Sequence, residues 1–219
     1  MVFLRQIHPA DQERMLDILT SDKVNKTYML PDFAHREDAI PLFERLMNMS
    51  QGTEKFVRGI ALEDGLIGFM NQVEAENGSI ELGYVIHPDF HGKGYMTQAL
   101  KLGFEALFDL GYREVITGAF STNAASIRVM EKCAMTKLSK TDEIEYRGIT
   151  HTCVYYSRKR SEMVFQCCFC GNATRPRNSY ALTITRAHDP EGPDQELYCC
   201  RGCLEQRLAD PKLLYLKYM

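Results

Sequence analysis

Two glycines that flank a lysine make the first chemically informative stretch of this chain of 219 residues. Gly92 and Gly94 lie in a loop that joins an expected strand, 79–86, to an expected helix, 95–110. Loops of this kind expose backbone N–H groups that bind a phosphate or pyrophosphate together with the helix dipole. Without side chains, the glycines let such a ligand approach the amides. A plain tight turn has the same pattern, so the loop alone leaves both interpretations open.

Six of the eight cysteines lie in two short clusters late in the sequence. Paired Cys-x-x-Cys units supply four thiolates for a tetrahedral zinc site, and the expected ligands are Cys167, Cys170, Cys200 and Cys203. The adjacent Cys168 and Cys199 are alternatives in this register. Disulfides are the competing interpretation, and a chain without a signal peptide favours metal. Four protein ligands leave no open position, so the predicted zinc is structural.

The residues around these cysteines suggest a small module. A hairpin is expected over 180–185 and 196–198, followed by a helix over 204–208 and further leucine-rich helix beyond it, packed on the rest of the protein. The order of knuckle, hairpin, knuckle and helix resembles a treble-clef or ribbon-like zinc module. Acidic and basic residues are mixed here, without the basic stripe that RNA binding needs. The pattern favours a partner-docking, acceptor-selecting or homodimer-forming role over nucleic-acid binding.

A second motif follows the glycine loop at a specific spacing. Asn123 opens an expected helix that also carries Ser126, Glu131 and Lys132. With the stretch 91–96, His-Gly-Lys-Gly-Tyr-Met, it resembles the GNAT superfamily of acetyl-CoA-dependent N-acetyltransferases, most closely the ribosomal-protein N-terminal acetyltransferase type. The family signature is Gln/Arg-x-x-Gly-x-Gly/Ala, followed later by Asn-x-x-Ser-x-x-x-x-Glu-Lys-x-Gly-Phe. This chain has His91 for Gln/Arg, Met96 for Gly/Ala, and Ala134 and Met135 for Gly-Phe.

The resemblance covers residues 1 to about 160 and implies an α/β (α+β) fold, with a mixed central sheet and helices on both faces. It implies acetyl-CoA as cosubstrate and a primary amine, on a protein N-terminus or a small molecule, as acceptor. The residues expected at the cosubstrate are Val85, Ile86, His91, Gly92, Lys93, Gly94, Tyr95, Met96, Thr97, Asn123 and Ser126. We expect this domain over 1–160 and the zinc module over 161–219.

Two residues are expected to carry the chemistry. Glu81 is the candidate base, because it lies on the strand face opposite Ile80 and Leu82, beside the small Gly83. A strand glutamate that bonds a neighbouring loop is an equally weighted alternative. The resemblance makes Ser126 the general acid, although a first-turn serine also commonly bonds backbone. Where many family members have a catalytic tyrosine, this chain has Met130.

Composition sets the remaining expectations. The net charge of −3 gives no electrostatic reason for binding bulk nucleic acid or an anionic membrane. The sequence starts with an expected strand, 1–7, rather than a signal peptide, so a cytoplasmic enzyme is expected. Helices are expected over 11–20 and 36–49, and aromatic and Met residues over 28–35 shape either a substrate site or, more simply, the core. A CoA-binding adaptor protein without turnover is the alternative function.

Overall fold

A computed structural model describes residues 1–63, 65–160, 165–174, 179–184 and 195–207. The chain divides into two compact units, Met1–Arg160 and Ser161–Met219. No described helix is both long and apolar enough to cross a membrane.

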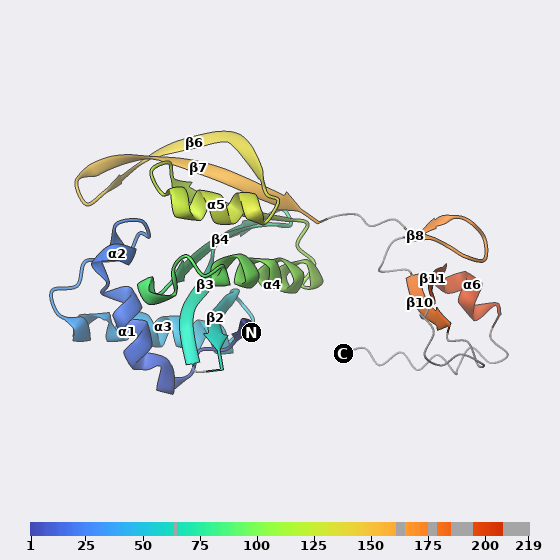
Figure 1. The fold of residues 1–219 in the computed structure, drawn as a ribbon, viewed down its shortest axis with the longest axis horizontal. Coiled ribbons are helices and arrows are strands. Elements are labelled where there is room, and N and C mark those ends of the chain that lie inside the picture. The colour runs from blue at the N-terminus through green and yellow to red at the C-terminus, as the bar shows by residue number, and fades with distance from the viewer. Residues whose placement is uncertain (64, 161–164, 175–178, 185–194, 208–219) are drawn as a thin grey trace. The chain divides into compact units, whose positions relative to one another are not determined.

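The first unit is built on a seven-stranded sheet (Figure 1). In chain order its strands are β1 (Phe3–Arg5), β2 (Val57–Leu62), β3 (Gly65–Glu76), β4 (Ser79–Ile86), β5 (Glu114–Phe120), β6 (Thr136–Tyr146) and β7 (Ile149–Lys159). Their spatial order is β1-β2-β3-β4-β5-β7-β6. Only β4 and β5 are parallel, and the other neighbouring pairs are antiparallel. The predicted mixed α/β sheet is confirmed.

Helices cover both faces of this sheet, as predicted. One face packs against α4 (Tyr95–Asp109) and α5 (Ala124–Lys132) through a core that includes Ile80, Leu82 and Leu100. The other packs against α1 (Gln12–Leu19), α2 (Asp22–Asn25) and α3 (Ile40–Gln51) through a core that includes Phe43 and Phe69. The two cores use alternate residues of the strands, because successive side chains point to opposite faces.

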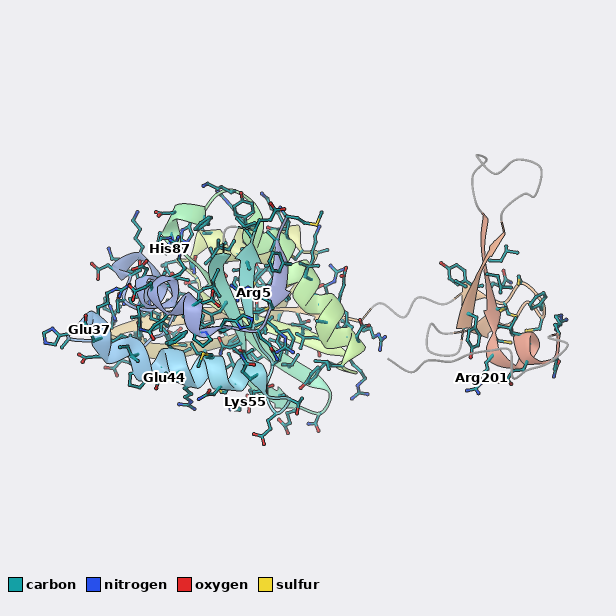
Figure 2. All side chains as sticks on the ribbon, turned by 90° about the horizontal axis from the view of Figure 1, so that it is seen from below. Arg5, Glu37, Glu44, Lys55, His87 and Arg201 are labelled. Carbon is teal, nitrogen blue, oxygen red and sulfur yellow. The ribbon has the colours of Figure 1, made fainter. Side chains whose placement is uncertain are left out.

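Short 3₁₀ turns precede two of these helices and a third lies before the glycine loop: η1 (Pro9–Asp11), η2 (Arg36–Ala39) and η3 (Pro88–Phe90). The helix expected over 36–49 therefore begins as η2, and α3 continues to Gln51. Amphipathicity explains its position, because Phe43 and Leu46 are buried while Glu44 points outward into solvent (Figure 2).

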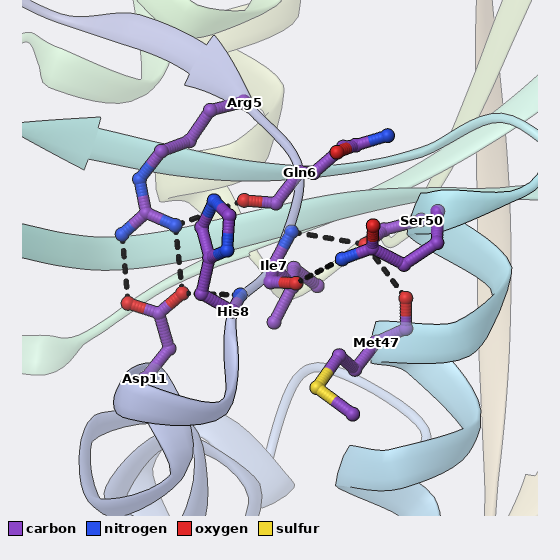
Figure 3. Close-up of polar contacts among 8 residues, drawn as sticks. Arg5, Gln6, Ile7, His8, Asp11, Met47 and Ser50 are labelled. Carbon is purple, nitrogen blue, oxygen red and sulfur yellow. Dashed lines mark hydrogen bonds and ion pairs between the residues drawn. The ribbon is translucent and has the colours of Figure 1, made fainter.

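A polar cluster fixes the start of the chain to α1 and α3 (Figure 3). Both guanidinium nitrogens Nη1 and Nη2 of Arg5 donate to the Asp11 carboxylate at 2.7 Å, and the His8 amide donates to the same group at 2.8 Å. On the other side, Ser50 Oγ accepts from the Ile7 amide at 2.9 Å and donates to the Met47 carbonyl at 2.8 Å. The buried backbone between β1 and α1 is thereby satisfied.

The second unit is small. It contains β8 (Phe165–Gln166) paired with β9 (Ala173–Thr174), a hairpin of β10 (Ser179–Ile184) and β11 (Gln195–Cys200), and α6 (Arg201–Glu205). Its described core is Cys167, Cys199 and Leu204. The helix begins at Arg201, earlier than predicted, so Cys203 lies inside it. The leucine-rich helix predicted beyond residue 207 lies outside the described residues.

Candidate active site and metal centre

The active-site cavity lies where β4 and β5 separate. The two strands pair only from Ser79 with Glu114 to Glu81 with Ile116, and beyond this point they diverge. The divergence leaves the ends of both strands without each other's hydrogen bonds. A cavity of about 400 Å³ lies there, lined by Gly83 to Ile86 of β4 and by Gly118 and Ala119 of β5. Its size is that of a small-molecule site.

The glycine loop forms one end of the cavity. Gly92 and Gly94 have φ values of +74° and +77°, a region that only glycine adopts without strain. Within the described residues, the amides of Gly92, Lys93 and Gly94 have no protein acceptor, and Gly94 caps α4 without a side-chain hydrogen bond. These amides and the first turn of α4 present donors and a positive dipole end to an anion. His91 supports the loop, because its Nε2 contacts the Ile86 carbonyl at 2.9 Å.

Positive charge reaches the same cavity from α5. Ala125, Arg128, Val129 and Lys132 line it, at the i, i+3, i+4, i+7 spacing of one helix face. The lining contains Arg128, Lys132 and His91 but neither Asp nor Glu. The sequence reasoning missed Arg128 and the lining role of Lys132, although this helical spacing after the Asn123 cap was a signal that could have found them. Free amides, two cations and open space at both glycines fit a phosphate-bearing cosubstrate such as acetyl-CoA.

Ser126 lines the same cavity and is held from two sides. Its amide donates to Asn123 Oδ1 at 3.1 Å, which makes Asn123 the cap of α5. Its Oγ lies 2.8 Å from Tyr84 Oη of β4. Burial raises the pKa of Tyr84 to about 12, against the opposing effect of the Ser126 hydroxyl. The Tyr84 phenol therefore keeps its proton at neutral pH.

Met130 is fully buried under this site. The Thr117 hydroxyl donates to the Met130 sulfur and is also within hydrogen-bonding reach of Tyr84. Ser126, Tyr84 and Thr117 thus form a continuous chain of hydroxyl groups from the cavity wall into the core. The local sequence indicates no role for Tyr84, because the contact joins residues 42 positions apart.

Glu81 is not part of the cavity lining. It lies at the last paired position of β4 and β5, two residues before Gly83 and on the same strand face. Burial raises the pKa of its carboxyl; Lys140 opposes this, and Glu74 and Asp142 add to it. A half-buried carboxylate with a raised pKa is a better proton acceptor near neutral pH than an exposed one.

Val24, Thr27 and Tyr28 line the end of the cavity where the Tyr28 hydroxyl lies against Gly83. Tyr28 donates its hydroxyl to Asn71 Oδ1, and burial raises its pKa. Tyr146, near the tip of the β6–β7 hairpin, accepts at its hydroxyl from the Leu30 amide at 3.3 Å. This end is uncharged, and Tyr28 both lines it and packs in the core.

The structure brings most of the predicted site residues to one cavity. Those that line it are Val85, Ile86, His91, Gly92, Gly94, Tyr95, Met96, Thr97, Asn123 and Ser126. Lys93 does not line it, and its ammonium group lies over the Phe90 ring, 5.4 Å from the centroid. Met96 is largely buried although it also lines the cavity.

Residues 2–136 match the acetyltransferase (GNAT) domain family. The chain belongs to the GNAT acetyltransferases. A relative from Bacillus subtilis (strain 168), named "Putative ribosomal N-acetyltransferase YdaF", is 28% identical over 74% of this chain and 92% of its own. Family membership makes this protein an acetyl-CoA-dependent N-acetyltransferase, and it does not favour the alternative of a CoA-binding adaptor.

Solved structures share the fold. One, from Salmonella typhimurium, is described as modifying the N-terminal serine of the 50S ribosomal subunit protein L7/L12; it has a TM-score of 0.63 at 18% identity and covers 73% of this chain and 95% of that one. A spermidine N-acetyltransferase from Vibrio cholerae, solved with CoA and spermine, has a TM-score of 0.63 at 14% identity and covers 73% of this chain and 96% of that one. At these identities the likeness establishes the GNAT fold.

The second unit gathers four sulfur atoms. The Sγ atoms of Cys167, Cys170, Cys200 and Cys203 all lie within 4.8 Å of one another, and those of Cys170 and Cys200 are 4.0 Å apart. Four thiolates around one zinc ion, with bonds of about 2.3 Å, have sulfurs about 3.8 Å apart. The donor set therefore fits a tetrahedral ion after a small contraction.

Backbone amides support these sulfurs. The Cys200 amide donates to Cys167 Sγ at 3.3 Å and, as the largest effect, lowers the pKa of the Cys167 thiol. The loop after Cys170 turns at Gly171, with φ at +71°, and the Gly171 amide donates to the Cys167 carbonyl at 2.8 Å. The alternatives point elsewhere: Cys199 Sγ donates to the Tyr180 carbonyl, and Cys168 is exposed outside the cluster.

Proposed function

We propose that this acetyltransferase modifies the N-terminal α-amine of a protein or peptide whose first residue is small and uncharged. The uncharged acceptor end of the cavity carries this proposal. Val24, Thr27 and Tyr28 line it, and the whole lining contains no carboxylate. A polyamine carries several positive charges and needs carboxylates along its length, because an unpaired charge is costly to desolvate.

The ionisation of the acceptor supports the same conclusion. An α-amine, with a pKa of about 7.7–8.0, is roughly one-quarter neutral near pH 7.4, whereas an alkylamine with a pKa of about 10.4 is neutral in about one molecule in a thousand. Only the neutral amine attacks the acetyl group. A cavity without a carboxylate in contact with the nitrogen therefore favours the acceptor that needs least help to lose its proton.

Within this proposal, Glu81 accepts the proton through water and Ser126 is the acid. Gly83, which lines the cavity, is two residues along β4 from Glu81, about 6–7 Å in an extended strand. Glu81 therefore lies outside direct contact with the acceptor nitrogen, and the proton passes through water. The loop 91–97, with Arg128 and Lys132, holds the phosphates of acetyl-CoA, which supplies the activated acetyl group. The names of the Bacillus subtilis and Salmonella typhimurium relatives support a ribosomal-protein acceptor.

One peptide that contains both kinds of amine tests the acceptor class. We would incubate the enzyme and acetyl-CoA with a peptide that begins with serine and contains one internal lysine, and locate the acetyl group by fragment mass spectrometry. The expected product carries it on the α-amine. A matched peptide with a blocked N-terminus should stay unmodified. Acetylation of the lysine in both peptides, or a preference for spermidine, contradicts the proposal.

For the second unit, the proposal is one structural zinc ion held by Cys167, Cys170, Cys200 and Cys203. Its described core of three buried residues is too small to fold without such support. Adjacent cysteines provide the test, because Cys200 belongs to the cluster and Cys199 does not. Cys200→Ser should lose bound zinc, measured by mass spectrometry of the metal content, whereas Cys199→Ser should keep one equivalent. Loss in both variants contradicts this ligand set. Homodimer formation and a cytoplasmic location stay predictions.

A further inference from the structure

Tyr84 and Ser126 form a contact between two hydroxyl groups in which either group can be the donor. Ser126 Oγ lies 2.8 Å from Tyr84 Oη, and the Ser126 carbonyl lies 3.4 Å from the same phenol oxygen. Both residues line the cavity. Each hydroxyl has one hydrogen, so when the phenol donates to Ser126 Oγ, the serine hydrogen is free to point into the cavity.

Thr117 allows the direction of this chain to reverse. Its hydroxyl is fully buried and lies between Tyr84 and the sulfur of Met130, a weak acceptor. When Thr117 donates to Met130, Tyr84 donates to Thr117 and receives the serine hydrogen. When Thr117 turns to donate to Tyr84, the phenol donates to Ser126. Only rotation of three hydroxyl groups separates the two arrangements.

We propose that Tyr84 is a positioning residue that makes Ser126 a proton donor to the departing CoA sulfur. The proposal rests on the acid role given above to Ser126. Ser126 passes its hydroxyl proton to the sulfur, which keeps the electron pair of the broken carbon–sulfur bond, and Tyr84 passes its phenolic proton to Ser126. Glu81, which has taken the proton of the attacking nitrogen, releases it to water, and water returns a proton to Tyr84. Protons and electrons balance, and the products are the amide and CoA thiol.

The phenol suits this step better than the serine alone. A serine hydroxyl left without a donor behind it commonly turns to a backbone carbonyl of its own helix. Here the N-terminal turn of α5 offers such carbonyls, and Tyr84 provides the contact that competes with them. The burial of Tyr84 also keeps the phenol protonated, so it is available as a donor over the whole neutral range.

The first test measures binding and needs no turnover. Calorimetry would compare CoA with desulfo-CoA, which lacks the sulfur, at pH values below and above the ionisation of the thiol. In the wild type, hydroxyl donors should favour the thiolate, so the preference for CoA over desulfo-CoA should grow about tenfold or more as the pH rises, as expected for a hydrogen bond to a charged group. Tyr84→Phe should lose most of this pH-dependent preference while it binds desulfo-CoA like the wild type.

The second test measures single-turnover acetyl transfer. Tyr84→Phe and Ser126→Ala should each slow it about 10- to 100-fold, and the double variant should be no slower than Ser126→Ala, because residues that act as a unit are not additive. Tyr156→Phe is the matched control. Its phenol contacts Glu131 on the same helix, outside the cavity lining, so it tests loosening of α5 alone.

The outcomes separate this inference from the proposed function. A slow Ser126→Ala with a normal Tyr84→Phe overturns the role of Tyr84 and leaves Ser126 as the acid. Normal rates in both variants overturn the two roles together. Additive losses, or a comparable loss in Tyr156→Phe, show that Tyr84 acts independently of Ser126 or only as structural support, and either result overturns the inference.

Discussion

Replacement of Gly94 by alanine separates cosubstrate binding from backbone strain. Gly94 has a φ of +77°, and a Cβ built there meets no protein atom within 4 Å. Gly148, at the tip of the β6–β7 hairpin, has a φ of +72° and equally open surroundings, but it does not line the cavity. The two alanine variants therefore share the cost of a left-handed backbone, about 1 kcal/mol each. For a unit of this size, that lowers Tm by about 2–4 °C.

Only the Gly94 variant should lose affinity for acetyl-CoA. Its methyl group projects into the space from which the loop amides reach a phosphate, and loss of one amide–phosphate hydrogen bond costs about 2 kcal/mol, which is about 30-fold in Kd. Calorimetric titration with acetyl-CoA measures this, and thermal unfolding measures the shared strain. Equal Kd values for the two variants, with equal losses in Tm, would refute the assignment of the loop as the phosphate site.

Three further changes test other parts of the structure. Glu81→Gln should slow acetyl transfer yet raise Tm near neutral pH, because the raised pKa of Glu81 means that its ionisation is costly in the folded state. Wild-type stability should therefore increase as the pH falls through that pKa, and the variant should lose this pH dependence. A variant with normal transfer rates excludes Glu81 as base. Asp11→Asn should lower the free energy of unfolding by about 2 kcal/mol at neutral pH, because it removes hydrogen bonds to a charged carboxylate. Burial raises the pKa of Asp11, but the hydrogen bonds from Arg5 and His8 outweigh this effect and hold the pKa low. The deprotonated form stabilises the fold above about pH 4 and this contribution is lost as the pH falls through the lowered pKa, so denaturant titrations of variant and wild type should converge in acid. Chelation of zinc should unfold the second unit, as measured by limited proteolysis, while the first unit continues to transfer acetyl groups to a short peptide. If chelation abolishes acetyl transfer as well, the two units do not fold independently.

Local patterns in the sequence were enough to predict the elements around the glycine loop. Alternating apolar residues predicted β4 within its observed bounds, and the apolar face that includes Leu100 and Phe104 predicted α4 to within a residue. Both patterns arise from burial on one face, which the chain encodes locally. Spacing likewise predicted the four cysteines that cluster in space, with Cys168 and Cys199 as alternatives in the register.

Contacts between distant segments could not be predicted in this way. The separation of β4 from β5 after Glu81 and Ile116 is a relation between two strands that are distant in the sequence, and no local pattern in either strand indicates it. Tyr84 has the spacing of a core residue, and only the approach of α5 gives its phenol a partner at Ser126. The distance of Glu81 from the cavity has the same origin, because strand periodicity gives the face of a residue but not how far the cavity extends along it.

The distribution of cysteines gives thiol reagents an unusual selectivity between the two units. Cys133 and Cys153, the two thiols of the acetyltransferase unit, are both buried, whereas Cys168 and Cys170 of the second unit are exposed. Alkylation of the folded protein should therefore label the second unit and leave the catalytic one unmodified. The number of labelled thiols then reports the integrity of the cysteine cluster while acetylation is followed in the same sample.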